Sequence, residues 1–185
     1  MKYLIRHAEK TDSSVHANLT KKGIVDAKKY GQELRSQNIH IDKIVTSPIY
    51  RCVQTAQSIA VGLKYNIPIV KSIKLGNPGV YISDDKKAME VFNNFSLLDI
   101  INMQLKKKIL PGFNNIESAS LELNSFIHSF SENVLFISHD AVIIPFVSWL
   151  HKKNEINHSD LIDYLYTYKL TQLSHIDSTK STNLS

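Results

Sequence analysis

The sequence predicts an α/β domain, a three-layer sandwich whose mostly parallel central sheet is flanked by helices. Two observations predict it. Short apolar runs alternate along the chain with longer stretches that carry apolar residues at helical spacing. One of these runs, 134–137, is apolar throughout, which is typical of a central strand buried on both faces. The length of 185 residues suits a single globular domain with one core.

The elements follow from these patterns in chain order. The expected strands are 3–5, 41–45, 68–70, 134–137 and 164–170. The expected helices are 21–37, one that starts near Pro48, 86–108, 116–130 and 141–150. Thr20 is the expected N-cap of the first helix, Thr46 or Ser47 that of the second, and Met89 is expected on the buried side of the third.

The domain is expected to end before the C-terminus. Residues 1–171 hold all the predicted elements, whereas residues 172–185 are rich in serine, threonine and asparagine. Such a composition favours a flexible tail over packed structure. We therefore expect one catalytic domain, 1–171, and a flexible tail, 172–185.

Composition narrows the classes of partner. The net charge is +5, but the lysines are scattered and no basic stripe with interleaved aromatics appears, so a small anionic substrate is favoured over nucleic acid. The single cysteine, Cys52, permits no disulfide within the chain and is expected to be a small buried side chain. No run approaches the ~20 apolar residues of a membrane span. These features predict a cytoplasmic protein without a membrane partner, and they predict no particular oligomeric state.

Polar side chains follow three of the predicted strands directly. Arg6 and His7 follow the first, Arg51 comes just after the second, and His139 and Asp140 follow the strand 134–137. In open α/β sheets, ligands bind at the carboxyl ends of the strands. We therefore expect these five side chains to meet at one edge of the sheet.

This set of residue types suits phosphoryl chemistry. An arginine fork matches phosphate oxygens, so Arg6 and Arg51 could clamp one phosphoryl group. A neutral imidazole can attack phosphorus and form a covalent intermediate. A metal site built on His7, His139 and Asp140 is the competing interpretation, which the two arginines disfavour because they would repel a cation.

Four short motifs, taken together, resemble those of the histidine phosphatase superfamily, which includes the cofactor-dependent phosphoglycerate mutases. They occur in the order and spacing of that family, over residues 3 to about 150. The matching segments are Arg6-His7-Ala8-Glu9, Leu19-Thr20-Lys21-Lys22-Gly23, Thr46-Ser47-Pro48 with Arg51 and Gln54-Thr55-Ala56, and Ser138-His139.

The resemblance implies a role for each matching position. His7 would be the nucleophile that becomes phosphorylated, and Arg6, Arg51 and His139 would complete the phosphate pocket. Two further residues are candidates for substrate contact. Glu9 matches a family carboxylate near the pocket. Asn18 lies in a loop with which the family can reach the substrate, although a turn residue is the preferred interpretation of it.

A general acid is expected because ester cleavage is faster when the leaving oxygen is protonated. The acid-phosphatase branch of the family has an Asp directly after the second histidine, which is where Asp140 stands; capping of the following helix is its other interpretation. The mutase-like branch uses a Glu in the middle segment. Asp84, Asp85 and Glu90 lie in that segment without a clear mutase pattern.

Together these observations predict a metal-independent phosphatase that needs no cofactor. It would hydrolyse a phosphomonoester of a small molecule, or protein phosphohistidine, through a phosphohistidine on His7. Two alternatives stay open. One is phosphoglycerate mutase-type phosphoryl transfer, disfavoured because mutases of the family are usually longer. The other is a binding module that holds a phosphorylated ligand without turnover. The natural substrate is not predicted.

Overall fold

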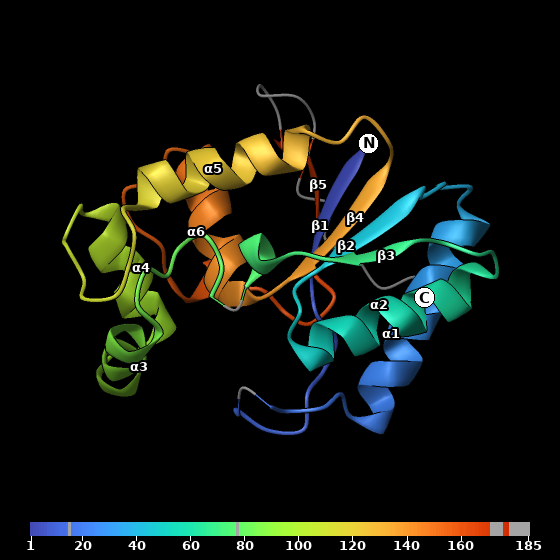
Figure 1. Ribbon diagram of the computed structural model, residues 1–185, viewed down its shortest axis with the longest axis horizontal. Coiled ribbons are helices and arrows are strands. Elements are labelled where there is room, and N and C mark those ends of the chain that lie inside the picture. Colours follow the sequence, from blue (N-terminus) through green and yellow to red (C-terminus); the bar gives the residue numbers. More distant parts are fainter. Residues whose placement is uncertain (15, 77, 171–175, 178–185) are drawn as a thin grey trace.

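The computed structural model describes residues 1–14, 16–76, 78–170 and 176–177 (Figure 1). The strands are β1 (Lys2–Arg6), β2 (Lys43–Thr46), β3 (Ile69–Lys71), β4 (Val134–Ser138), β5 (Thr167–Leu170) and β6 (Ile176–Asp177). The α-helices are α1 (Lys21–Ser36), α2 (Tyr50–Leu63), α3 (Asp85–Asn94), α4 (Leu97–Leu105), α5 (Ile116–His128) and α6 (Asp140–Leu150). Two short 3₁₀ helices are η1 (Ile73–Leu75) and η2 (His158–Asp160).

The strands form one sheet in the order β3-β2-β4-β1-β5-β6. The first four of these are mutually parallel, with β4 between β2 and β1. β5 runs antiparallel to β1, and β6 runs antiparallel to β5. The predicted fold class, a mostly parallel sheet flanked by helices, is confirmed. The expected strand 164–170 corresponds to β5, which lies between β1 and β6 and is antiparallel to both.

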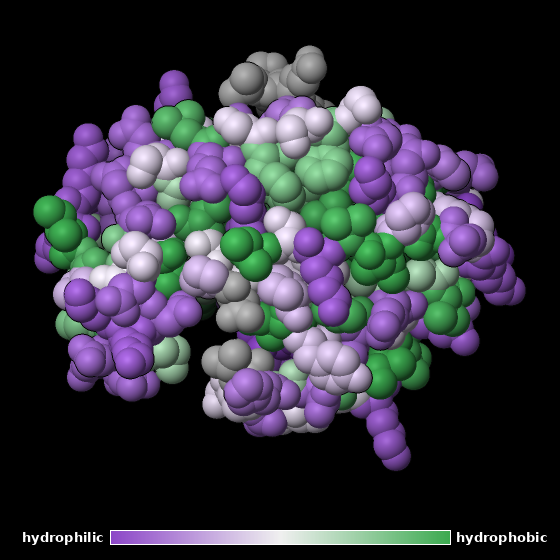
Figure 2. Space-filling model, in the orientation of Figure 1, coloured by the Kyte–Doolittle hydropathy of each residue, from purple (hydrophilic) through white to green (hydrophobic). Residues whose placement is uncertain are grey.

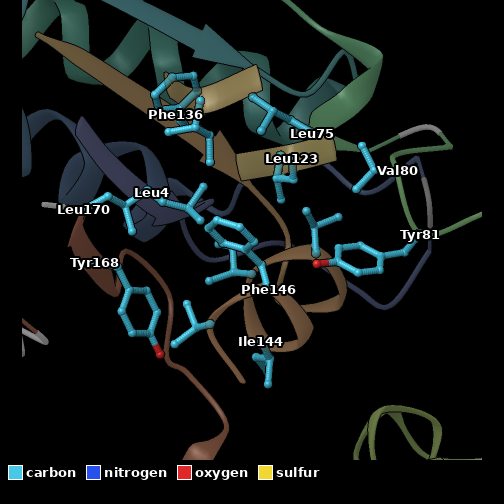
Figure 3. Close-up of a cluster of buried hydrophobic side chains, with 14 of the residues drawn as sticks. Leu4, Leu75, Val80, Tyr81, Leu123, Phe136, Ile144, Phe146, Tyr168 and Leu170 are labelled. Carbon is cyan, nitrogen blue, oxygen red and sulfur yellow. The ribbon is translucent and has the colours of Figure 1, made fainter. Parts of the chain in front are cut away.

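The two faces of the sheet pack against different helices (Figure 1). Leu4 and Phe136 point into one core, which is completed by α5 and α6. Ile5 and Ile137, their neighbours in the same strands, point into a second core with α1 and α2. This alternation follows from the two-residue period of a strand. Figure 3 shows the first core, in which Phe146 of α6 lies beside Leu4.

β4 is buried along its whole length, as expected for a central strand. The predicted tail, 172–185, lies outside the described residues except for Ile176–Asp177, which form β6. Among the helices that the structure describes, none combines the length and the apolar character that a membrane crossing requires.

Three local expectations were wrong. The N-cap of α2 is Ile49, which has an extended backbone and makes no side-chain cap bond, so neither Thr46 nor Ser47 caps this helix. The expected helix over 86–108 is two helices, because Ser96 starts a new one through a reciprocal capping box with Asp99. In α3, Met89 is exposed, and Ala88 and Val91 are buried instead.

The strand register brings the expected polar residues to one edge of the sheet. Arg6, the last residue of β1, pairs with Ser138 at the end of β4. Thr46, the last residue of β2, pairs with Ile137. In Figure 2 the surface is notched on the side toward which these strands run, between the part that carries α3 and the part that carries the loop after β1.

Candidate active site

His7 lies at the centre of this edge, just beyond β1, and only 2% of its surface is exposed. Its Nδ1 lies 2.8 Å from the carbonyl oxygen of Ala8. Because a carbonyl oxygen can only accept, Nδ1 carries the proton and Nε2 presents its lone pair. Burial lowers the pKa of His7 to about 4, so the imidazole is neutral near pH 7.

Arg51, in the first turn of α2, lies between the two histidines. Its Nε donates to Nε2 of His7 at 3.1 Å, and one of its terminal nitrogens lies 3.2 Å from Nδ1 of His139. The two imidazole rings are 5.3 Å apart, centroid to centroid. Burial, together with the nearby His7 and Arg51, holds the pKa of His139 well below its usual value. The inner part of the site is therefore two neutral imidazoles bridged by one guanidinium.

His139 is held in place from its far side. Its Nε2 lies 3.0 Å from Oγ of Ser47 and 3.5 Å from Sγ of Cys52. Gly76 closes this wall: a Cβ at that position would lie 2.6 Å from Cδ2 of His139. Its φ of 131° also favours glycine. Cys52 is fully buried, and burial raises the pKa of its thiol, which agrees with the expected packing role.

Arg6 forms the outer part of the site with Asp140. One terminal nitrogen of Arg6 lies 2.6 Å from a carboxylate oxygen of Asp140, and the other donates to the carbonyl of Ile162. Its Nε is buried and has no hydrogen-bond partner among the described residues. A buried donor without an acceptor is costly, and a ligand oxygen would satisfy it.

Asp140 is the first helical residue of α6, whose N-cap is His139. One oxygen of Asp140 accepts from the backbone N–H of Ala141, and the other pairs with Arg6. The carboxylate is thus partly a helix-start acceptor and partly a site residue. Its side chain is 30% exposed, so water reaches it.

Tyr164 is a site residue that the sequence interpretation missed. Its ring centroid lies 4.5 Å from the guanidinium carbon of Arg6 and 5.7 Å from the ring centroid of His7. Its segment returns to β1 just before β5, where the backbone N–H of Leu165 donates to the carbonyl of Arg6. The run of tyrosines at 164–168 beside an expected strand was the available signal, but it does not reveal the contact.

Lys10 is a further cation near the site. It is half-buried, and its backbone forms an isolated bridge with Leu19 across the neck of the loop after β1. Burial lowers the pKa of Lys10, and the positive charges of Arg51 and Arg6 lower it further. The site therefore lies in a positive field, which attracts anions.

Two predicted substrate contacts have partners in the loop after β1 and at the start of α1. The carboxylate of Glu9 is 3.3 Å from Nζ of Lys22, at the start of α1. Asn18 is exposed, and its carbonyl accepts from the backbone N–H of Thr11 within the loop. Asp84, one alternative acid, caps α3 by accepting from two backbone N–H groups. The other two, Asp85 and Glu90, are exposed on α3.

The remaining motif residues fix the loop after β1. Thr55 accepts from the backbone N–H of Ala8 at 3.1 Å, and Gln54 accepts from that of Leu19 at 2.9 Å. Gly23 lets α1 approach the same loop, since a Cβ there would lie 2.3 Å from the carbonyl oxygen of Glu9. These contacts place His7 against α2, and so against Arg51.

The donor set does not favour a metal ion. Within the described part of the chain, no three or more His, Cys, Asp or Glu side chains are grouped so that they could hold one. The arrangement instead offers an uncharged nitrogen nucleophile, two guanidinium groups and one carboxylate, which together suit an oxyanion.

Solved structures with this fold confirm the architecture. Bacillus stearothermophilus YhfR is 19% identical, with a TM-score of 0.64 over 100% of this chain and 97% of that one. An Escherichia coli K-12 protein described as a putative alpha-ribazole-5'-P phosphatase is 18% identical, with a TM-score of 0.62 over 97% and 95%. The protein histidine phosphatase SixA, complexed with tungstate, is 15% identical, with a TM-score of 0.56 over 90% and 85%.

Residues 2–77, which carry Arg6, His7 and Arg51, match the family profile described as "Histidine phosphatase superfamily (branch 1)". This stretch of the chain resembles the histidine phosphatase superfamily. A search of curated proteins found no match. The profile match ends before β4, so His139 and Asp140 lie outside the matched residues, and their place beside Arg51 and Arg6 comes from the fold of this chain.

Proposed function

We propose that the chain is a phosphatase that works through a phosphohistidine on His7, without a metal ion. One observation carries the proposal: a buried, neutral His7 whose Nδ1 proton is bound to Ala8, so that Nε2 faces Arg51 with its lone pair. A nucleophile of this kind is ready to attack at neutral pH without a separate base. The buried Nε of Arg6, which lacks an acceptor, supports a phosphate oxygen as the missing partner.

The first step transfers the phosphoryl group to the enzyme. Nε2 of His7 forms a bond to phosphorus as the bond from phosphorus to the leaving oxygen breaks. Arg51 and Arg6 neutralise the charge on the phosphoryl oxygens. A proton from Asp140 goes to the leaving oxygen, and the leaving group departs as the neutral alcohol.

Asp140 can supply that proton because substrate binding changes its surroundings. In the free site its carboxylate is paired with Arg6 at 2.6 Å. A bound phosphate competes for Arg6 and places negative charge near Asp140. One carboxylate oxygen of Asp140 then lies beside the bound phosphate, where it can exchange a proton with the leaving oxygen.

The second step regenerates the enzyme. Asp140, now ionised, accepts a proton from a water molecule as its oxygen bonds to phosphorus. The bond between phosphorus and Nε2 of His7 breaks, and inorganic phosphate leaves. The 30% exposure of Asp140 gives water access to this position. A mutase would instead have to return the phosphoryl group to an organic acceptor.

The substrates named for the neighbours support this reaction class. Those proteins include a protein histidine phosphatase that holds tungstate, an oxyanion, and a putative alpha-ribazole-5'-P phosphatase. We propose phosphomonoesters, or protein phosphohistidine, as the substrate class of this chain as well. Its site residues are proposed as His7, Arg6, Arg51, His139 and Asp140.

The test is hydrolysis of an aryl phosphate with excess EDTA, for the wild-type protein and for His7→Ala. The proposal expects activity that survives EDTA in the wild type and is lost in the variant. Activity in both proteins would contradict a role for His7. If the wild type hydrolyses no phosphate but binds inorganic phosphate in calorimetry, the chain is a binding module. Isomerisation of phosphoglycerate would indicate a mutase.

A further inference from the structure

One wall of the site comes from a segment that the phosphoryl chemistry leaves unused. Residues 161–166 return from η2 to the carboxyl end of β1 and are fixed there by three bonds to Arg6. The side chain of Arg6 donates to the carbonyl of Ile162, and its backbone N–H donates to the carbonyl of Tyr166. The backbone carbonyl of Arg6 accepts from the backbone N–H of Leu165. Because the segment is tied to a site residue at three points, its side chains have fixed places relative to His7.

Tyr164 is the side chain that this segment brings to the site. Leu165, the next residue, has a φ of 60°, a left-handed conformation that an ordinary residue adopts only when the surroundings impose it. This turn directs Tyr164 toward Arg6 and His7, where its ring meets both. The backbone strain supports a functional reason for the position of the ring.

The ring of Tyr164 lies beside the same arginine as Asp140, the residue that is proposed to protonate the leaving group. Tyr164 and Asp140 contact the same guanidinium, that of Arg6, at 4.5 Å and 2.6 Å respectively. If Asp140 protonates the leaving oxygen, the atoms bonded to that oxygen lie near Asp140 and so meet Tyr164. Tyr164 is 38% exposed, so it has surface left to contact a ligand. An aromatic ring in this position offers a flat, apolar face.

We propose that Tyr164 is a specificity-determining residue that selects substrates whose leaving group is a planar, unsaturated ring, such as an aryl, benzyl or imidazole group. This inference rests on the proposed phosphatase function. Offset stacking and edge-to-face contacts between rings favour aromatic over saturated groups beyond the area that both bury. A saturated ring of the same size gains burial but not this additional contact.

The experiment compares kcat/KM for benzyl phosphate and cyclohexylmethyl phosphate, two esters of primary alcohols that differ in whether the ring is aromatic. The proposal expects the wild-type protein to prefer benzyl phosphate by about two- to tenfold. Tyr164→Leu should lose the preference, and Tyr164→Phe should keep it. Loss of the contact with Arg6 in Tyr164→Leu affects both esters alike, so the ratio isolates the leaving group.

Tyr166→Leu is the matched control. Its ring contacts that of Tyr168 and lines a cavity of about 670 Å³ between α6 and the segment 158–168. This variant should keep the wild-type preference for benzyl phosphate. Loss of the preference in Tyr166→Leu but not in Tyr164→Leu would overturn the inference.

The outcomes separate this inference from the function on which it rests. If the wild type hydrolyses both esters equally, in a reaction that His7→Ala abolishes, the phosphatase function stands and the inference fails. If the wild type hydrolyses neither ester nor any aryl phosphate, the proposed function fails, and the inference fails with it. A preference that survives in a folded Tyr164→Leu protein also overturns the inference.

Discussion

The inner and outer parts of the site differ in charge and in burial. The inner part, His7, Arg51 and His139, is buried, and its two imidazoles are neutral. The outer part, Arg6, Asp140 and Tyr164, holds an ion pair and is partly exposed. In the proposed mechanism the two parts have separate roles. The inner part would supply an uncharged nucleophile and a fixed phosphate pocket, and the outer part would transfer the proton to the leaving group.

The largest expected effect on activity that tests this difference comes from replacing Asp140, the carboxylate of the outer part. Asp140→Asn should lower kcat/KM for an alkyl phosphate by about 10²–10⁴-fold, because an alkoxide leaves poorly without a proton. The same change should cost much less for p-nitrophenyl phosphate, whose leaving group needs no proton. Kinetics with both esters measure the difference.

Asp84→Asn is the matched control for this prediction. An asparagine keeps the N-cap bonds that Asp84 makes at the start of α3, so activity on both esters should stay at the wild-type level. Equal losses on the two esters in Asp140→Asn would contradict general-acid catalysis and leave Asp140 as a residue that positions Arg6.

In the inner part, Arg51→Ala should lower kcat/KM by about 10²–10³-fold for every phosphate ester, independently of the leaving group. The reason is that Arg51 would stabilise charge on the phosphoryl oxygens, which all esters share. Arg35→Ala removes an exposed arginine of α1 and serves as the control. A loss of kcat/KM in Arg51→Ala that depends strongly on the leaving group would contradict the separate roles proposed for the two parts.

The wall behind His139 gives a steric test. In Gly76→Ala the new methyl group would meet the imidazole at 2.6 Å and should displace it, lowering kcat/KM by about 10²-fold. Gly112→Ala is equally strained, with a φ of 78°, but its contacts are with α3. It should lose stability and keep its kcat. Unchanged kcat/KM in folded Gly76→Ala would show that the position of His139 is not critical.

A smaller effect is expected in the dependence of the free energy of unfolding on pH. The pKa of His7 is about 4 in the folded chain and about 6.5 when exposed, so between these values the unfolded chain binds the proton more readily. The free energy of unfolding should therefore fall as the pH falls from 6.5 to 4, with His7 contributing about 3 kcal/mol.

Urea unfolding of wild type and His7→Asn at several pH values checks this contribution. Asparagine does not titrate, so the variant should lose part of the pH dependence; His139 supplies the rest, because burial lowers its pKa too. Identical slopes of stability against pH in the two proteins would indicate that His7 is not held neutral by the fold.

The sequence predicted the inner part better than the outer part, for a physical reason. His7, Arg51 and His139 each follow a parallel strand closely, and parallel strands end at one edge, so their meeting follows from the order of elements. Tyr164 reaches the site by a turn at Leu165 that no glycine or asparagine announces. Composition therefore could not place the ring.

Two other contacts could not be predicted from the local sequence pattern. No local pattern indicated that Gly76 would pack against His139, since that contact joins segments far apart in the chain. The ion pair of Arg6 with Asp140 also depends on the exact register of β1 with β4. The predicted helix boundaries were wrong where a single side chain decides them, as Ser96 does at the start of α4.

The most direct test of the central claim is to trap the intermediate. The protein is mixed with a ³²P-labelled phosphate ester in EDTA and quenched in alkali, and the labelled peptide is located by mass spectrometry. The account predicts an acid-labile, alkali-stable label on Nε2 of His7, because Nδ1 is bound to the carbonyl of Ala8. A label on another residue or on Nδ1, or turnover that leaves no label on rapid quenching, would contradict it.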